Sequence, residues 1–156
     1  MGNLMYWPYL QVFLVSILPI VELRGAIPWG IAKLGLDWLP VLLLAMTSNI
    51  LVVPFIWLFL KFGQKILIKF KWGEKLWQWL VDRVQRKFSG KYYSAGVIGL
   101  LLFVGIPLPG TGVWTGTLAG YLFGFRKRDV LKAMVGGVLL AGIIVTILTV
   151  GVGKMF

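Results

Sequence analysis

The sequence predicts an all-α integral membrane protein. We expect an inverted repeat of a re-entrant helical hairpin plus a transmembrane helix, with a cytoplasmic amphipathic helix between the two repeats. First, 59% of the 156 residues are hydrophobic and the mean hydropathy is +0.89, too apolar for a soluble domain of this size. Second, residues 38–60 and 92–125 carry no charge, and about 20 apolar residues suffice to cross a membrane. Third, short loops rich in Pro and Gly interrupt two apolar blocks.

The N-terminal half contains two apolar blocks. The second, residues 38–60, predicts one full transmembrane helix. The first, residues 4–36, is interrupted by Pro19, Glu22, Arg24, Gly25 and Pro28. These interruptions predict a loop inside the first block.

The third block, residues 92–125, is the most informative part of the sequence. As one helix it would be about 50 Å long, well beyond the hydrocarbon core of about 30 Å. Two prolines and three glycines fall within residues 105–112 and would stop a helix. Each arm, 92–104 and 113–125, reaches only to about the middle of the bilayer. We therefore expect a re-entrant hairpin here, followed by a second full transmembrane helix over residues 130–152.

The distribution of charge gives an independent argument for this topology. Residues 61–91 carry nine Lys and Arg against two acidic residues, so the positive-inside rule places them in the cytoplasm. The same rule places Arg126, Lys127 and Arg128 there, which a hairpin permits and a single crossing forbids. We expect one membrane domain made of repeat one (4–60), a linker (61–91) and repeat two (92–153). Such inverted repeats are typical of secondary transporters, with binding sites near the midplane.

The linker is predicted to contain an amphipathic helix over residues 75–88 that lies in the cytoplasmic interface. Trp72, Trp77 and Trp79 would lie at headgroup level, and anionic lipid headgroups are the expected partner of residues 61–91. The helix either anchors the linker or senses lipid. The net charge of +11 does not indicate nucleic acid, because the basic residues sit beside membrane segments.

Glu22 and Arg24, within a Glu22-Leu23-Arg24-Gly25-Ala26-Ile27-Pro28 segment, are the first candidate site. Each charge would cost on the order of 3 kcal/mol at the bilayer centre, so both must be paired, hydrated or facing a cavity. Residues two apart on a helix point in different directions, so we expect no pair within a helix. In a non-helical loop both would line one cavity, with Glu22 taking a proton or contacting substrate and Arg24 as counter-charge or anion ligand. The alternative is that both lie at an interface.

The second candidate site is the loop of the third block. Its glycines would let the backbone approach a ligand, and the helix starting near Val113 would present free N–H groups to an anionic headgroup or phosphate. The alternative is a tight turn without ligand contact. The loop contributes Pro107, Pro109, Gly110, Thr111 and Gly112 to the predicted site, together with Thr115.

Asn49, in the middle of the second block, is the third candidate. Asn in hydrocarbon usually bonds to another helix, so structural packing is the favoured interpretation and cavity lining the second. The sequence shows no nucleophile–base pair or P-loop, and it has no Cys or His. We therefore expect no enzyme activity, no metal and no cofactor.

Both motifs together resemble a known family. Pro19-x-x-Glu22-Leu23-Arg24-Gly25-Ala26-Ile27-Pro28 and, about 80 residues later, Pro107-Leu108-Pro109-Gly110-Thr111-Gly112-x-Trp114-Thr115-Gly116 are similar in order and spacing to the prokaryotic small multidrug export family, which is grouped with the DedA superfamily of VTT-domain proteins. The resemblance implies a multi-pass protein of a prokaryotic inner or plasma membrane. For the DedA branch it also implies proton-dependent lipid flipping. DedA proteins tend to carry arginine near the second loop, whereas residues 92–125 here carry no charge.

The expected function is therefore a transporter or lipid flippase, coupled to protons. It would move a lipid-like or amphipathic substrate through a midplane cavity between the two re-entrant loops. The alternatives are a proton/drug antiporter and a non-transporting membrane scaffold or assembly factor. A homodimer is a further expectation, because one chain of this length encloses little volume.

Overall fold

The computed structural model describes residues 3–88 and 93–153, and the described part of the chain consists of helices joined by short turns and loops, without a strand. Two helices are long and apolar enough to cross a membrane, α3 and α7. The elements in chain order are α1 (Asn3–Ile17), α2 (Glu22–Pro28), the π-helical turn η1 (Trp29–Lys33), α3 (Trp38–Leu67), α4 (Lys71–Phe88), α5 (Tyr93–Gly105), α6 (Val113–Leu122) and α7 (Lys127–Gly153). The predicted all-α class and the two membrane-length helices are confirmed.

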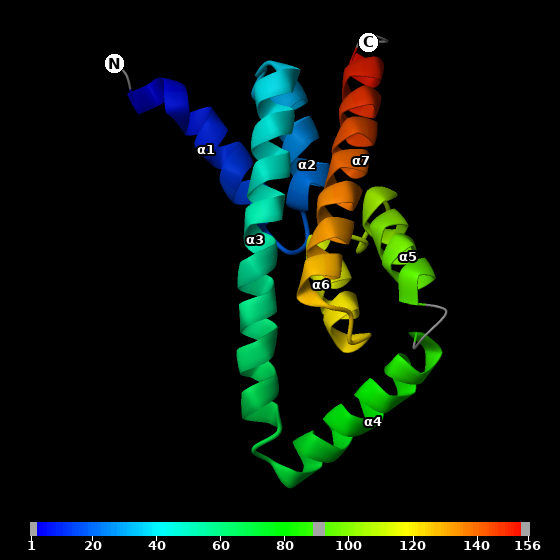
Figure 1. Cartoon of the computed structure of the whole chain (residues 1–156). Coiled ribbons are helices and arrows are strands. Elements are labelled where there is room, and N and C mark those ends of the chain that lie inside the picture. The colour runs from blue at the N-terminus through cyan, green and yellow to red at the C-terminus, as the bar shows by residue number, and fades with distance from the viewer. Residues whose placement is uncertain (1–2, 89–92, 154–156) are drawn as a thin grey trace.

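The long helices α3 and α7 run through the centre of the molecule, and α2 and α6 each pack against both of them, α2 in the upper half and α6 in the lower half (Figure 1). Helix α1 lies on the outer side of α3, and α5 lies on the outer side of α7 (Figure 1). We call α1, residues 18–21 and α2 hairpin one, and α5, residues 106–112 and α6 hairpin two. The turn of hairpin one lies at mid-height, level with the start of α6 (Figure 1). The start of α1 and the end of α7 lie at one end of the molecule, and α4 lies across the other end (Figure 1).

Small residues let the helices of the second half pack closely. A Cβ atom on Gly137 of α7 would lie 2.7 Å from the Val104 side chain, and one on Gly116 of α6 would lie 2.5 Å from the same residue. Ala133, Gly137 and Ala141 recur every fourth residue of α7 and are buried. Membrane helices usually pack closely over small side chains. In lipid there is no hydrophobic driving force between helices, so van der Waals contact between closely spaced backbones drives their association.

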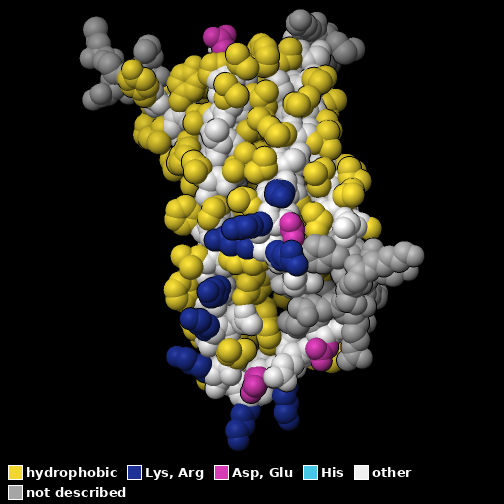
Figure 2. Space-filling view, in the orientation of Figure 1, with side chains coloured by type: hydrophobic (Ala, Val, Ile, Leu, Met, Phe, Trp, Pro, Cys, Tyr) yellow, Lys and Arg dark blue, Asp and Glu magenta, His cyan; other side chains and the backbone are white. Residues whose placement is uncertain are grey.

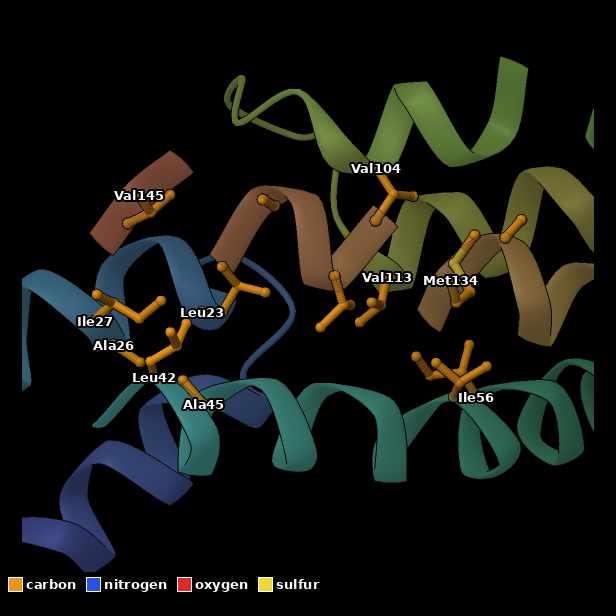
Figure 3. Packing of buried hydrophobic residues seen from close by; sticks show 14 of the residues in the cluster. Leu23, Ala26, Ile27, Leu42, Ala45, Ile56, Val104, Val113, Met134 and Val145 are labelled. Carbon is orange, nitrogen blue, oxygen red and sulfur yellow. The ribbon is translucent and has the colours of Figure 1, made fainter. Parts of the chain in front are cut away.

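The core extends along the whole molecule from hairpin one to hairpin two. Leu23, Ala26 and Ile27 of α2 are nearly inaccessible and face Leu42 and Ala45 of α3 (Figure 3). Farther along α3, Ile56 faces the α6–α7 half of the core, which includes Val113 and Met134 (Figure 3). Both hairpins are thus held against the same pair of long helices.

Two features of the first half differ from the prediction. The Glu22–Pro28 segment was expected to be a non-helical loop, but it is helix α2, and the chain reverses at residues 18–21 instead. Pro28 ends α2, and the chain continues as a π-helical turn, whose wider bonding pattern suits the place where proline lacks an N–H group. The helix predicted over residues 38–60 continues to Leu67.

The second half follows the prediction more closely. The arms expected at residues 92–104 and 113–125 correspond to α5 and α6, and the helix expected at 130–152 corresponds to α7. The amphipathic helix expected at 75–88 begins one turn earlier, at Lys71. Gly110 adopts a φ of +80° in the turn of hairpin two, a conformation that favours glycine.

Lys and Arg gather on the half of the molecule that carries α4, whereas the other half is almost entirely apolar on the visible face (Figure 2). The end of α3 contributes Lys61 and Lys65 to this basic half, and the start of α7 contributes Lys127 and Arg128, all exposed. Charge is therefore segregated along the long axes of α3 and α7.

Candidate functional site

The two hairpins meet where each of them reverses direction. Glu22 is the first residue of α2, immediately after the turn of hairpin one, and its φ is +51°. Such a φ is uncommon for a residue other than glycine, and it points to a local constraint at this position. The Glu22 side chain does not continue along its own helix. It reaches across to hairpin two.

The Glu22 carboxylate lies at the N-terminus of α6. Its Oε2 accepts a hydrogen bond from the Val113 amide at 3.2 Å, and its Oε1 accepts one from the Trp114 amide, also at 3.2 Å. Only 3% of Glu22 is exposed. These two N–H groups have no partner within the helix, and the helix dipole is positive at this end, so a negative charge is favourable here.

Gly112 makes this approach possible. A Cβ atom at Gly112 would overlap the Glu22 carboxylate. The backbone of Gly112 is extended, with a φ of −98°, so conformation alone would permit any residue here. Glycine is required for space.

Arg24 binds the C-terminal end of α5, which is the second helix end at the tip of hairpin two. Its guanidinium donates to the Val104 carbonyl at 2.9 Å, in the last turn of α5, and to the carbonyl and Oγ1 of Thr111. It also donates to Glu22 Oε2 at 3.0 Å. A cation is favourable at the negative end of a helix dipole. Each charge of the pair therefore lies at the helix end of opposite sign, and the pair joins the two hairpins.

The expectation that Glu22 and Arg24 form no pair within one helix is wrong. They form an ion pair although they are two residues apart and both belong to α2. The reason is the positive φ of Glu22, which takes its side chain out of the helical pattern that separates positions two apart. The side chain of Arg24 is 17% exposed, and its buried Nε has no hydrogen-bond partner among the described residues.

A cavity of about 340 Å³ lies between the hairpin tips. Eight residues of the predicted site line it: Glu22, Arg24, Gly25, Pro107, Pro109, Gly110, Gly112 and Thr115. Pro19, Ile20 and Val21 of the turn in hairpin one complete the lining. The cavity therefore combines an ion pair with apolar proline and aliphatic walls.

The other three residues of the predicted site lie elsewhere. Pro28 ends α2, and Thr111 serves as an acceptor for Arg24 rather than as cavity lining. Asn49 is fully buried, and its Nδ2 donates to the Ser16 carbonyl at 2.7 Å. This bond joins α3 to the last turn of α1, as the favoured interpretation of Asn49 predicts.

Trp114 is a residue whose role the sequence analysis missed. Its indole N–H donates to the Ile17 carbonyl at 3.1 Å, at the end of α1, while its amide donates to Glu22. It therefore ties α6 to both sides of the turn in hairpin one. The available signal was a tryptophan directly after a Gly-rich break, because an indole N–H inside apolar surroundings needs an acceptor.

Among the described residues, no group of three side chains of the metal-binding types lies close enough to hold an ion. The cavity offers a ligand apolar walls beside one carboxyl group, that of Glu22, and one guanidinium group, that of Arg24.

Comparison with protein families supports one part of the resemblance of the two motifs, the small multidrug export family. The family described as "Putative small multi-drug export protein" matches residues 22–144 of the chain. No curated protein and no solved structure matches the sequence. The matched span begins at Glu22 and contains every contact between hairpin two and the ion pair.

Proposed function

This chain belongs to the small multi-drug export protein family, and on that premise we propose that it is a proton-coupled membrane transporter of amphipathic or lipid-like molecules. The observation that carries the proposal is the Glu22–Arg24 pair. It lies between the two hairpin tips, lines the cavity of about 340 Å³, and is held by the broken ends of α5 and α6. Charged side chains inside membrane proteins are rare and costly, and they mark substrate or proton pathways.

The proposed topology has two re-entrant hairpins of opposite orientation. The spacing of the helices supports it, since α1 ends at Ile17 and α5 at Gly105, 88 residues later, while α3 begins at Trp38 and α7 at Lys127, 89 residues later. The segregated charge supports an orientation with α4 in the cytoplasm of a prokaryotic cell. In this topology the ion pair lies near the bilayer midplane, where secondary transporters built from inverted repeats bind their substrates.

The walls of the cavity define the substrate class. Pro19, Ile20 and Pro107 give it apolar surface, and the ion pair gives it one polar end. A volume of about 340 Å³ is at the small end for ligand sites, which suits a headgroup or one part of a drug-sized molecule. The family name favours a drug, and the resemblance to DedA proteins favours a lipid, so both enter the test below.

Protonation of Glu22 is the proposed coupling step. A neutral carboxyl group would lose its attraction to Arg24 and to the positive end of α6, and an O–H group would replace one of its acceptor positions. The contact between the hairpins would then weaken, and the tips would separate enough to expose the cavity. Proton release would restore the contact. A carboxylate at this place therefore links proton uptake to the opening of the cavity.

The experiment uses the full chain in phospholipid vesicles with two probes, a fluorescent hydrophobic cation and a phospholipid with a labelled headgroup. We expect one of them to move faster with the protein, and faster still under a pH gradient. Glu22→Gln should remain folded but lose the response to the gradient. Glu74→Gln, which changes an exposed glutamate of α4 in the same way, is the matched control and should behave like the unchanged protein.

Three results would contradict parts of the proposal. If neither probe moves, the transport claim is wrong. If Glu22→Gln responds to the gradient as the unchanged protein does, proton coupling is wrong. If Arg24→Ala prevents folding while neither probe moves in the unchanged chain, the non-transporting scaffold is the better explanation. A specific observation favours that scaffold as the second candidate, because the contacts of the pair with Val104, Val113 and Trp114 also satisfy helix ends.

A further inference from the structure

Helix α4 carries a stripe of large apolar side chains that are about half exposed or more. Trp72, Leu76 and Trp79 recur with the spacing of one helical face, and they are 65%, 49% and 55% exposed. The adjoining side of α4 carries Lys71 and Lys75, both exposed. An apolar stripe beside a row of lysines is the pattern of a helix that lies in the surface of an anionic membrane.

A different side of α4 is packed against the protein. Gly73 is buried, and a Cβ atom there would overlap the Leu67 carbonyl. The Trp77 ring lies 5.9 Å from the ring of Tyr121, between centroids. The contacts of Gly73 and Trp77 thus occupy one part of the apolar surface of α4. Trp72 and Leu76 lie on another part, which is exposed.

Tyr121 connects α4 to the transmembrane part. Its ring meets Trp57 of α3 edge to face with centroids 4.9 Å apart, and its hydroxyl is hydrogen-bonded to Gln64 of the same helix. Tyr121 lies near the end of α6, whereas Val113 and Trp114 at the start of α6 bind Glu22. Helix α6 therefore has α4 at one end and the ion pair at the other, about 12 Å apart along a rigid helix.

We propose that α4 binds the surface of an anionic lipid leaflet through Trp72, Leu76 and the neighbouring lysines. The second part of the proposal concerns the hairpin junction, the contact between the two hairpins at Glu22 and Arg24. The contact of α4 with Tyr121 makes this junction respond to lipid binding. The positive charge near this surface favours an anionic lipid as its partner. Lys61 and Lys69 are exposed and lie within 14 residues of the exposed Lys71 and Lys75 in the sequence, and a zwitterionic surface would not attract these lysines. The coupling to the junction rests on the proposed transport function, whereas the binding of α4 does not.

Surface binding can be measured without any transport assay, because the chain has no cysteine of its own. Single cysteines replace Leu76 on the stripe and Gln78 on the polar side, and each carries an environment-sensitive dye. In phosphatidylcholine vesicles that also contain phosphatidylglycerol, the label at position 76 should shift to an apolar emission and the label at 78 should not. Lys71→Gln and Lys75→Gln should each weaken the response about fivefold. A label at position 76 that is equally solvated with and without phosphatidylglycerol would overturn the binding surface.

The coupling is tested by the ratio of transport rates in vesicles with and without phosphatidylglycerol. We expect this ratio to exceed one in the unchanged chain, to fall to one in Trp77→Ala and to persist in Trp77→Phe, which keeps a ring against Tyr121. The dye at position 76 should still report immersion in Trp77→Ala, which shows that the helix remains on the membrane. An unchanged ratio in Trp77→Ala would overturn the coupling. Absence of transport in every lipid would refute the proposed function and leave the dye result as the test of the surface.

Discussion

Gly112→Ala should separate the Glu22 carboxylate from α6 without straining the backbone. The added methyl group would occupy the place of the carboxylate, and the extended backbone of residue 112 accepts alanine. The steric part of the cost is small, because the end of a flexible side chain can move. The larger part is the loss of two amide hydrogen bonds at 3.2 Å and of the ion pair at 3.0 Å.

The expected loss of stability in Gly112→Ala is estimated from the ion pair that the displaced carboxylate no longer forms. Breaking a buried ion pair costs about 3–5 kcal/mol, and the adjacent cavity lets the displaced carboxylate find water, so we expect the lower end, about 3 kcal/mol. Unfolding in detergent, followed by circular dichroism, measures the difference. Gly99→Ala is the matched control in hairpin two, because no atom of the described residues lies within 4 Å of a Cβ atom there. It should be neutral or stabilising by up to about 1 kcal/mol. Equal stability of Gly112→Ala and the unchanged chain would refute the described role of Glu22.

Other substitutions test the remaining contacts. Arg24→Lys should reduce transport and stability together, because one ammonium group cannot reproduce a guanidinium fork shared by two carbonyls and a carboxylate; transport at the unchanged rate would contradict this. Asn49→Leu should cost about 1–3 kcal/mol in detergent unfolding, because the Ser16 carbonyl loses its partner, whereas Thr47→Val on the exposed side of α3 should change stability little. Trp114→Phe should lower stability by about 1 kcal/mol through loss of the bond to the Ile17 carbonyl, and a larger loss would mean that the ring also packs against the core.

The sequence was sufficient to predict the helices that coincide with long apolar runs. Residues 38–60 and 130–152 are charge-free or nearly so, and they lie within α3 and α7. The break at residues 105–112 was also predictable, because two prolines and three glycines exclude a helix whatever the surroundings. What composition could not predict is the continuation of α3 to Leu67, where basic residues on an amphipathic turn extend the helix beyond the apolar run.

The candidate site was predictable as a set of residues and not as a geometry. Charge inside an apolar block indicated Glu22 and Arg24, and the structure brings both to the loop at residues 107–112. Their pairing accompanies one unusual dihedral angle at Glu22, whose carboxylate contacts a residue more than 80 positions away. Rules based on the spacing of neighbouring residues cannot predict contacts between residues so far apart in the sequence. For the same reason the role of Trp114 was missed, since its acceptor belongs to α1.

The most direct test of the account is to fix the two hairpin tips together and measure transport. Ile20 and Pro109 line the same cavity from opposite hairpins and are exposed, and cysteines at both positions would be the only cysteines of the chain. A cleavable bifunctional thiol reagent that joins them should stop movement of the transported probe, and reduction should restore it. Each single-cysteine variant treated alike measures the effect of one modified cavity residue, and the cross-linked double variant should transport less than either. Continued transport by the cross-linked protein would contradict the claim that the tips must separate at Glu22 and Arg24.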